Sequence, residues 1–181
     1  MLFLQSDLLM TIRDRLESGH SKTITNQIIR YVGRDKERFN ELLDVFFGKD
    51  KKLQQRAAWP LGYLAEGNPR LIEPHLKNLI RLLEQQGNHP AVARCILRIF
   101  QQYDMPDKYH GELIDLCFKF ILNPSTPIAI RAYAITTAAH ISVAYPELKR
   151  EMLLVLDELG HEEQPPAIRV RLKIALKTLR T

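Results

Sequence analysis

Histidine, cysteine and acidic side chains could support metal or acid–base chemistry, but their spacing in this chain predicts neither. The six histidines are scattered, and none stands at metal-ligand spacing from another histidine or a cysteine: His20, His75, His89, His110, His140 and His161. The patterns G-x-x-x-x-G-K-[ST] and G-x-S-x-G, which mark phosphate-binding loops and serine nucleophiles, are both absent. We therefore expect no metal site, no cofactor, no small-molecule substrate and no enzymatic activity.

The cysteines and the N-terminus indicate the compartment. Cys95 and Cys117 lie in apolar stretches, which is typical of core residues in a reducing environment. The N-terminal stretch MLFLQSDLLM lacks a basic region and is interrupted by Asp7, so we expect no signal peptide. No apolar run approaches the roughly 20 residues needed to span a membrane. These features predict a cytoplasmic protein without a membrane partner.

Arginine recurs along the chain with a nearly constant period. Arg56, Arg94, Arg131 and Arg169 are separated by 38, 37 and 38 residues, and each lies in a segment of helical periodicity rich in small residues. Leucine-rich segments such as LIEPHLKNLIRLL alternate with them. A helical pair repeated at this period is typical of a solenoid, in which each pair buries its apolar face on the next.

Helix-stopping residues divide the whole chain without leaving a linker. They lie near Gly19, Gly33, Gly48, Gly67-Asn68-Pro69, Gly87-Asn88, Met105-Pro106, Asn123-Pro124, Tyr145-Pro146 and Gly160. Strand alternation is absent. We expect an all-α chain of about ten helices, folded as one domain over residues 1–181 into an α-α superhelix of about five hairpins. Residues 1–33 would form a degenerate first pair and 35–181 four clearer pairs, with close helix contacts at Ala57, Ala58 and Ala134.

One segment carries a resemblance to a known family. LQQRAAWPLGYL (Leu53 to Leu64) resembles the second helix of a HEAT repeat, V-R-x-x-A-A-x-A-L-G-x-L, with matches at Ala57, Ala58, Leu61, Gly62 and Leu64. LIEPHLKNLIRLL is similar to the first helix of the next repeat, including its helix-internal Pro74, and Ile130-Arg131 and Ile168-Arg169 fit the V-R pair. The resemblance covers residues 35–181 and is closest to small bacterial HEAT-repeat proteins. Proteins of this type can carry the name adenylosuccinate lyase, but this chain is far too short for that fold and lacks its S-S-x-M-P-x-K-x-N-P loop.

One face of the second helices gathers basic, aromatic and polar residues. Trp59 lies almost opposite the apolar stripe of its helix, and Pro60 beside it is expected to bend that helix. Arg98 and Thr136 follow Trp59 at steps of 39 and 38, and Gln102 and His140 follow Tyr63 by the same steps. Because second helices line the concave surface of HEAT proteins, the resemblance implies a groove there. We call its residues the strip: Arg30, Arg56, Trp59, Tyr63, Arg98, Gln102, Tyr133, Thr136 and His140.

The strip predicts a non-enzymatic scaffold or adaptor that binds a protein or an acidic peptide on its concave face. Trp59 and Tyr63 would supply anchoring area and the arginines would orient acidic groups. Packing of Trp59 against a neighbouring repeat is the alternative for that side chain. In the last helix, Arg169, Lys173, Lys177 and Arg180 form a stripe that we expect to cap the terminal repeat.

Nucleic-acid binding or repair is the second function that the sequence leaves open. A net charge of +5 permits an acidic partner of this kind. The architecture also resembles HEAT-like alkylpurine DNA glycosylases, which grip DNA in the concave face. That resemblance implies an acid near concave aromatic residues, and Glu66 is the candidate.

Overall fold

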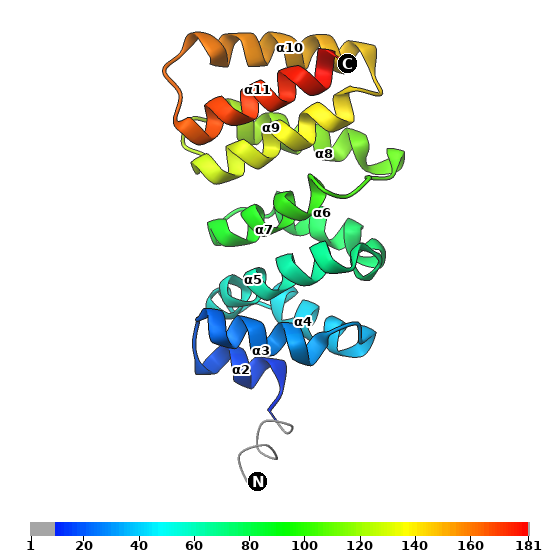
Figure 1. Cartoon of the computed structure of the whole chain (residues 1–181), viewed down its shortest axis with the longest axis vertical. Coiled ribbons are helices and arrows are strands. Elements are labelled where there is room, and N and C mark those ends of the chain that lie inside the picture. Colours follow the sequence, from blue (N-terminus) through cyan, green and yellow to red (C-terminus); the bar gives the residue numbers. More distant parts are fainter. Residues whose placement is uncertain (1–9, 181) are drawn as a thin grey trace. The chain divides into compact units, whose positions relative to one another are not determined.

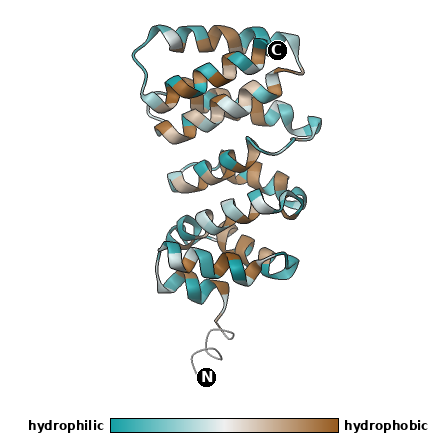
Figure 2. Ribbon diagram, in the orientation of Figure 1, coloured by the Kyte–Doolittle hydropathy of each residue, from teal (hydrophilic) through white to brown (hydrophobic). Residues whose placement is uncertain are grey.

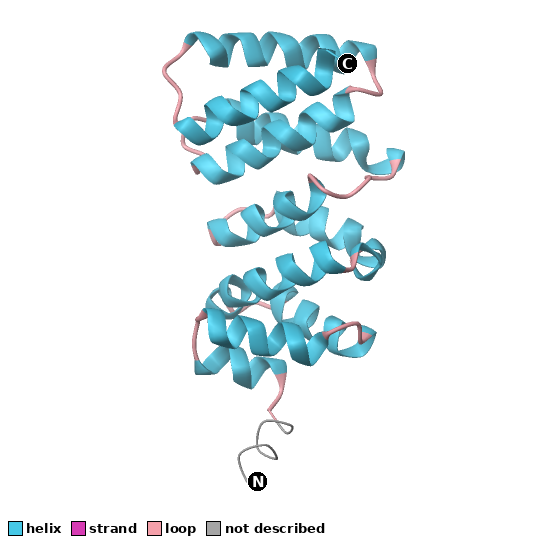
Figure 3. Ribbon diagram, viewed as in Figure 1, coloured by secondary structure: helices cyan, strands magenta, loops and turns pink. Residues whose placement is uncertain are grey.

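The computed structural model describes residues 10–180, and that part of the chain is helical without any β-strand (Figures 1 and 3). Three 3-10 turns, η1 (Pro69–Leu71), η2 (Glu73–His75) and η3 (Asp107–Tyr109), join the α-helices. The ten α-helices of this range are α2 (Ile12–Ser18), α3 (Lys22–Val32), α4 (Lys36–Phe47), α5 (Lys51–Gly67), α6 (Leu76–Glu84), α7 (Pro90–Phe100), α8 (His110–Leu122), α9 (Ile128–Ser142), α10 (Pro146–His161) and α11 (Pro166–Arg180).

The described residues form two compact units. The first comprises residues 10–78 and 85–95, and the second comprises 79–84 and 96–180. The all-α prediction is confirmed. The single domain over residues 1–181 stays a prediction, and the predicted absence of a signal peptide concerns residues outside the described range.

Short polar side chains start the helices of the first unit. Thr11 and Asp14 form a capping box at α2, in which each side chain accepts from the backbone N–H of the other residue. Asp35 caps α4 and Asp50 caps α5, each accepting two backbone N–H groups of the first turn. These caps satisfy donors that a helix start leaves without partners. The predicted breaks at Gly19, Gly33 and Gly48 all follow the last residue of a helix.

Two helix boundaries differ from the prediction. The segment that was expected to be helical around Pro74 holds η1 and η2, and the α-helix α6 begins only at Leu76. Pro74 has no N–H and its ring would clash with the carbonyl four residues earlier, so the α-helical pattern starts after it. Gly160 does not end a helix, because α10 continues to His161. A single glycine inside a helix costs only about 1 kcal/mol, and Pro165 and Pro166 mark the end of that connection.

Helix α5 organises the first unit, because it packs against α2, α3 and α4. It continues through Pro60 as one helix from Lys51 to Gly67. Its buried side includes Leu53, Ala57 and Leu61, and α4, which packs against it, buries Phe39 and Phe46. Figure 2 shows brown, hydrophobic residues interleaved with teal, hydrophilic ones along the helices of this unit. The bend expected at Pro60 stays a prediction.

Helix α9 has the central place in the second unit. It packs against α8, α10 and α11, and its contacts with α8 and α11 are the most extensive. Ten of its residues are buried, four of them alanines: Ala132, Ala134, Ala138 and Ala139. Small side chains allow neighbouring backbones to approach closely, as expected from the sequence at Ala134. The apolar faces of α8 and α11, including Cys117 and Leu172, complete this core.

None of the described helices has the length and apolar character that crossing a membrane requires. The stripe predicted on α11 is exposed at Arg169, Lys173, Lys177 and Arg180.

Enlarging Ala134 is predicted to destabilise the second unit. Ala134 is fully buried in α9, so Ala134→Leu must displace neighbouring side chains or backbone, at a cost of about 1–3 kcal/mol in the free energy of unfolding. Urea denaturation measures this cost. Ala167→Leu is the matched control, because Ala167 is exposed on α11 and the same substitution there should change stability by less than about 0.5 kcal/mol. Equal effects of the two changes would contradict the packing of α9.

The cysteine thiols are predicted to be unreactive in the folded protein. Both cysteines are buried thiols that form no disulfide, and burial raises the pKa of the Cys117 thiol far above its ordinary value. Because the thiolate is the reactive form, a raised pKa keeps Cys117 protonated at neutral pH. A thiol-reactive chromophore should therefore modify Cys117 only after denaturant is added, as mass spectrometry of the digested protein would show. Rapid labelling of Cys117 in native buffer would contradict its placement in the core.

Candidate protein-binding surface

The predicted strip is divided between the two units. Arg30, Arg56, Trp59 and Tyr63 belong to the first, on α3 and α5. Arg98, Gln102, Tyr133, Thr136 and His140 belong to the second, on α7, on the segment that follows it and on α9. Each half is built by helices that pack within its own unit, α3 against α5 in the first and α8 to α11 around α9 in the second.

Trp59 is half-buried rather than fully exposed. Its ring is tilted against the imidazole of His20, with 5.7 Å between the ring centroids. His20 lies between α2 and α3, so the contact joins α5 to the preceding helical pair. Trp59 thus combines some packing between pairs with a surface that remains accessible.

Arg56 holds the end of a neighbouring helix. Its Nη1 donates to the carbonyl oxygens of Leu16, at 2.6 Å, and Glu17, at 3.1 Å. Both carbonyls belong to the last turn of α2, where a helix leaves acceptors without partners and carries partial negative charge. The guanidinium is therefore engaged in the structure of the first unit, although the sequence predicted it to orient a ligand.

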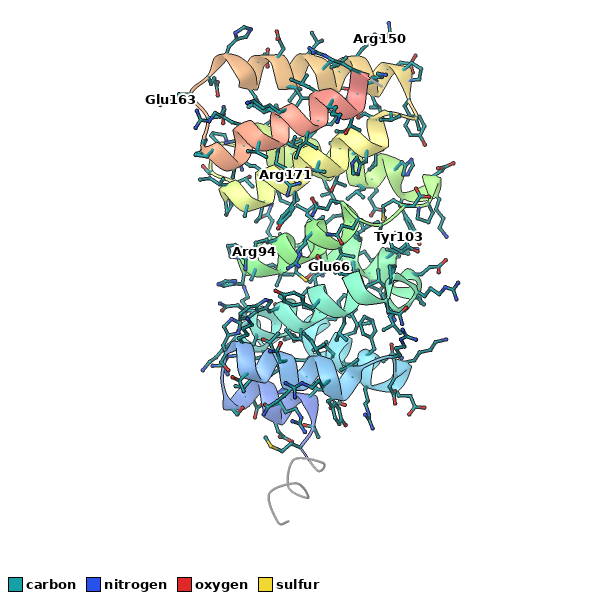
Figure 4. All side chains as sticks on the ribbon, in the orientation of Figure 1. Glu66, Arg94, Tyr103, Arg150, Glu163 and Arg171 are labelled. Atoms are coloured by element: carbon teal, nitrogen blue, oxygen red, sulfur yellow. The ribbon has the colours of Figure 1, made fainter. Side chains whose placement is uncertain are left out.

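Tyr63 and Arg30 are the more accessible members of the first half. Tyr63 is 44% exposed and lies one helical turn after Trp59 on α5. Arg30 is exposed in the last turn of α3, which packs beside α5. Glu66, labelled in Figure 4, is half-buried near the end of α5, one turn beyond Tyr63. This part of the first unit therefore offers an exposed phenol, a half-buried indole and a basic side chain.

In the second half, Arg171 connects three helical segments. It comes from α11, and its guanidinium carbon lies 5.4 Å from the centroid of the Tyr133 ring on α9. Its Nη1 also donates to Gln101 Oε1 and Thr136 Oγ1, each at 3.3 Å. Arg171 is half-buried by these contacts, and Figure 4 shows it among the side chains where α11 crosses α9.

The placement of Thr136 corrects its predicted role. Thr136 is only 5% exposed, and its hydroxyl donates to the carbonyl of Ala132 while accepting from Arg171. It supports Arg171 rather than offering its own surface to a partner. Arg171 and Gln101 were not predicted from the sequence as members of this face. A signal for Arg171 was present, because it follows Tyr133 by 38 residues, as Arg169 follows Arg131.

The periodic arginines do not form one uniform row. Arg131 is half-buried, and its Nε donates to the carbonyl of Ile121 in the last turn of α8. Arg94 and Arg169 are exposed. Two members of the series, Arg56 and Arg131, therefore share one function: each donates to carbonyls at the C-terminal end of a neighbouring helix.

Gln102 and His140 come together at a hollow in the second unit. This hollow, of about 510 Å³, lies where α7 ends, η3 and α8 begin and α9 ends. We call it the α7–α9 hollow. Acidic, imidazole and hydroxyl groups share its lining with apolar ones: Phe100, Gln101, Gln102, Tyr103, Asp104, Met105, Asp107, His110, Thr137, His140, Ile141, Val143 and Ala144. Tyr103 is labelled in Figure 4.

His110 has both ring nitrogens occupied. Nε2 donates to the carbonyl of Met105 at 2.7 Å, and Nδ1 lies 3.0 Å from the hydroxyl of Tyr145, from which it can accept. These two contacts fix the segment between α7 and α8. Within residues 10–180, no group of three histidine, cysteine or acidic side chains is arranged to hold a metal ion.

Comparison with known proteins gives one match. A family model described as a HEAT repeat domain matches residues 12–179, which is nearly the whole chain. The comparisons with curated proteins and with solved structures give no match.

Replacing Arg56 is predicted to lower stability, whereas replacing Arg30 is not. Arg56→Met keeps the aliphatic stem but removes the hydrogen bonds to Leu16 and Glu17, at a cost of about 1–2 kcal/mol in the free energy of unfolding. Arg30→Met, at an exposed position, should change it by less than about 0.5 kcal/mol. Urea denaturation of both variants measures the difference. An unchanged free energy of unfolding for Arg56→Met would contradict the structural role of Arg56 and leave its side chain available to a ligand.

Proposed function

Because the chain belongs to the HEAT repeat family, we propose that it is a non-enzymatic scaffold or adaptor that binds a protein or peptide partner on the face of its second helices. HEAT repeats are helical scaffolds that generally mediate protein interactions. In this chain, the strip residues are those that would contact the partner on that face.

The pair formed by Tyr63 and Trp59 is the observation that carries the proposal. Both side chains come from the same face of α5, one turn apart, and α5 is held by three other helices. Tyr63 is 44% exposed and Trp59 is half-buried, so both retain surface that a partner can cover. Aromatic side chains held on a rigid element bind with little loss of conformational entropy, and Trp and Tyr are enriched among the residues that dominate interface energies.

Basic side chains in each of the two units favour an acidic partner. Arg30 extends from α3 in the first unit, and Arg171 is held over Tyr133 by Gln101 and Thr136 in the second. A guanidinium whose position is already set by the protein loses less freedom when it pairs with a carboxylate. Arg56 contributes indirectly, by fixing α2 against α5 rather than by contacting the partner.

Tyr63→Ala is predicted to weaken partner binding without unfolding the protein. The partner would be identified by affinity capture with the full chain from its native cells, with and without nuclease treatment. Its affinity for the wild-type protein and for each variant would then be measured by titration calorimetry. Removing an anchoring tyrosine should cost about 2 kcal/mol or more of binding free energy. Tyr63 is the better test than Trp59, because Trp59 also packs on His20 and its loss affects stability.

Leu154→Ala is the control for this experiment. Leu154 is 69% exposed on α10, outside the strip, so its replacement should leave the affinity unchanged. Equal affinities of the wild-type and Tyr63→Ala proteins would contradict the proposed surface. Loss of all captured material after nuclease treatment would instead favour a nucleic acid as the partner.

A further inference from the structure

Arg171 keeps one edge of its guanidinium group outside the contacts that fix its position. Both of its hydrogen bonds come from Nη1, which donates to Gln101 Oε1 and Thr136 Oγ1, and the guanidinium carbon lies 5.4 Å from the centroid of the Tyr133 ring. Within residues 10–180, Nε and Nη2 make no hydrogen bond, and neither belongs to the buried polar atoms that lack a partner. Both nitrogens of this half-buried side chain are therefore accessible to solvent.

The accessible edge has the geometry that binds a carboxylate. In the planar guanidinium group, the N–H of Nε and one N–H of Nη2 point in the same direction, so they can donate to the two oxygens of a single carboxylate. No acidic side chain of residues 10–180 pairs with Arg171. Charged groups that are withdrawn from water are usually paired with an opposite charge. The two observations together indicate that Arg171 is prepared for an anion from a partner.

Apolar side chains surround Arg171 on its own helix. The residues three and four positions away from it on α11, which are its neighbours on the helix surface, are all apolar: Ala167, Ile168, Ile174 and Ala175. Ile174 is 41% exposed, and Val170, its neighbour four residues earlier, is 55% exposed. Arg169 and Lys173 lie on the other side of the helix, because two residues turn an α-helix by about 200°. The surface beside Arg171 on α11 is therefore apolar rather than basic.

We propose that Arg171 and Ile174 bind an acidic side chain of a protein partner together with the apolar side chain that adjoins it. The carboxylate accepts from Nε and Nη2 of Arg171, and the apolar side chain covers Ile174 and Val170. We call these three residues the carboxylate site. This inference rests on the proposed function and adds the chemistry of the partner, which is a single acidic residue next to an apolar one rather than a run of acids.

A nucleic-acid backbone fits this surface less well. Proteins that bind nucleic acids neutralise successive phosphates with several lysine or arginine side chains, whereas Arg171 has apolar neighbours on α11. Bases of single strands stack on the faces of aromatic rings, but the Tyr133 ring already has the Arg171 guanidinium against it. The exposed Ile174 and Val170 instead match an apolar side chain of a peptide.

The test is an NMR titration of the full chain that follows backbone amides and arginine Nε–H groups. The probes are tripeptides with acetyl and amide caps and the sequences LEL, LQL and SES, and a thymidine hexanucleotide. The LEL peptide should cause saturable shifts at Tyr133 and Ile174 and of the Arg171 Nε–H signal, with a Kd of about a millimolar. The LQL peptide lacks the charge and the SES peptide lacks the apolar side chains, so each should bind at least about threefold more weakly.

Arg171→Lys tests the two-pronged contact with the carboxylate. The variant keeps the positive charge but loses the planar pair of donors, so it should weaken the binding of the LEL peptide by about three- to tenfold. Unchanged backbone signals from α8 and α10 would show that the variant is folded. Arg150→Lys is the matched control, because Arg150 is exposed on α10 and pairs with Glu147, and its replacement should leave the Kd unchanged.

Ile174→Ser tests the apolar part of the site at an exposed position, where the substitution should not disturb folding. It should weaken the binding of the LEL peptide by about two- to fivefold and leave the binding of the SES peptide unchanged. Leu154→Ser is the matched control, because Leu154 is 69% exposed on α10, outside the carboxylate site. Its replacement should not change the Kd of either peptide.

The absence of saturable shifts with the LEL peptide, or an equal Kd for the LEL and LQL peptides, would overturn the proposal. An unchanged Kd in Arg171→Lys, or tighter binding of the hexanucleotide than of the LEL peptide at Arg171, would overturn it as well. None of these results bears on Tyr63, which belongs to the first unit. Conversely, a failure of Tyr63→Ala to weaken partner binding would contradict the proposed function, and the titration with the LEL peptide would still decide whether Arg171 binds a carboxylate.

Discussion

The close packing of α9 against α8 and α11 is the contact on which the second unit depends. A helical pair in a repeat protein has too little apolar surface to be stable alone, so each pair must bury one face on its neighbour. Helix α9 buries small residues such as Ala134 and Ala138, which allow neighbouring helices to approach closely. The same closeness places Arg171 of α11 within reach of Thr136 and of Gln101 beyond α7. The polar face of this unit therefore follows from the packing of its core.

Arginine has a structural function in both units that limits what it can do at the surface. Each helix ends with carbonyl groups that lack partners in their own helix. Arg56 donates to such carbonyls in α2, and Arg131 donates to one in α8. The periodic recurrence of arginine thus reflects in part the unpartnered carbonyl groups at helix ends, which recur with every helical pair and need a donor. The residues left for a partner are those outside this pattern, including Arg30 and the aromatic pair on α5.

Helix positions were predictable from the sequence because their signals are local. Caps such as Asp35 and Asp50, and the glycines after α2, α3 and α4, act within one turn of the helix end that they define. The exposure of a single strip residue could not be predicted in this way, because it depends on residues far away in the sequence. The helical wheel shows which face Thr136 occupies, but its burial depends on Arg171, which lies 35 residues away. The α7–α9 hollow could not be predicted from the sequence either, because its lining combines residues from the end of α7 and the end of α9. The prediction that Pro74 lies inside an α-helix was wrong. The family pattern allows a proline at that position, but local sterics exclude it from the α-helix.

Charge on the second unit is separated over a short distance, and Gln101 lies at the boundary. Its Oε1 accepts from Arg171, while the residue itself lines the hollow with Asp104 and Asp107. Arg171 is drawn towards Tyr133 and Thr136 by a cation–π contact and a hydrogen bond, so its charge is held on α9 rather than in the hollow. Holding Arg171 in place therefore presents a fixed cation to acidic groups of a partner.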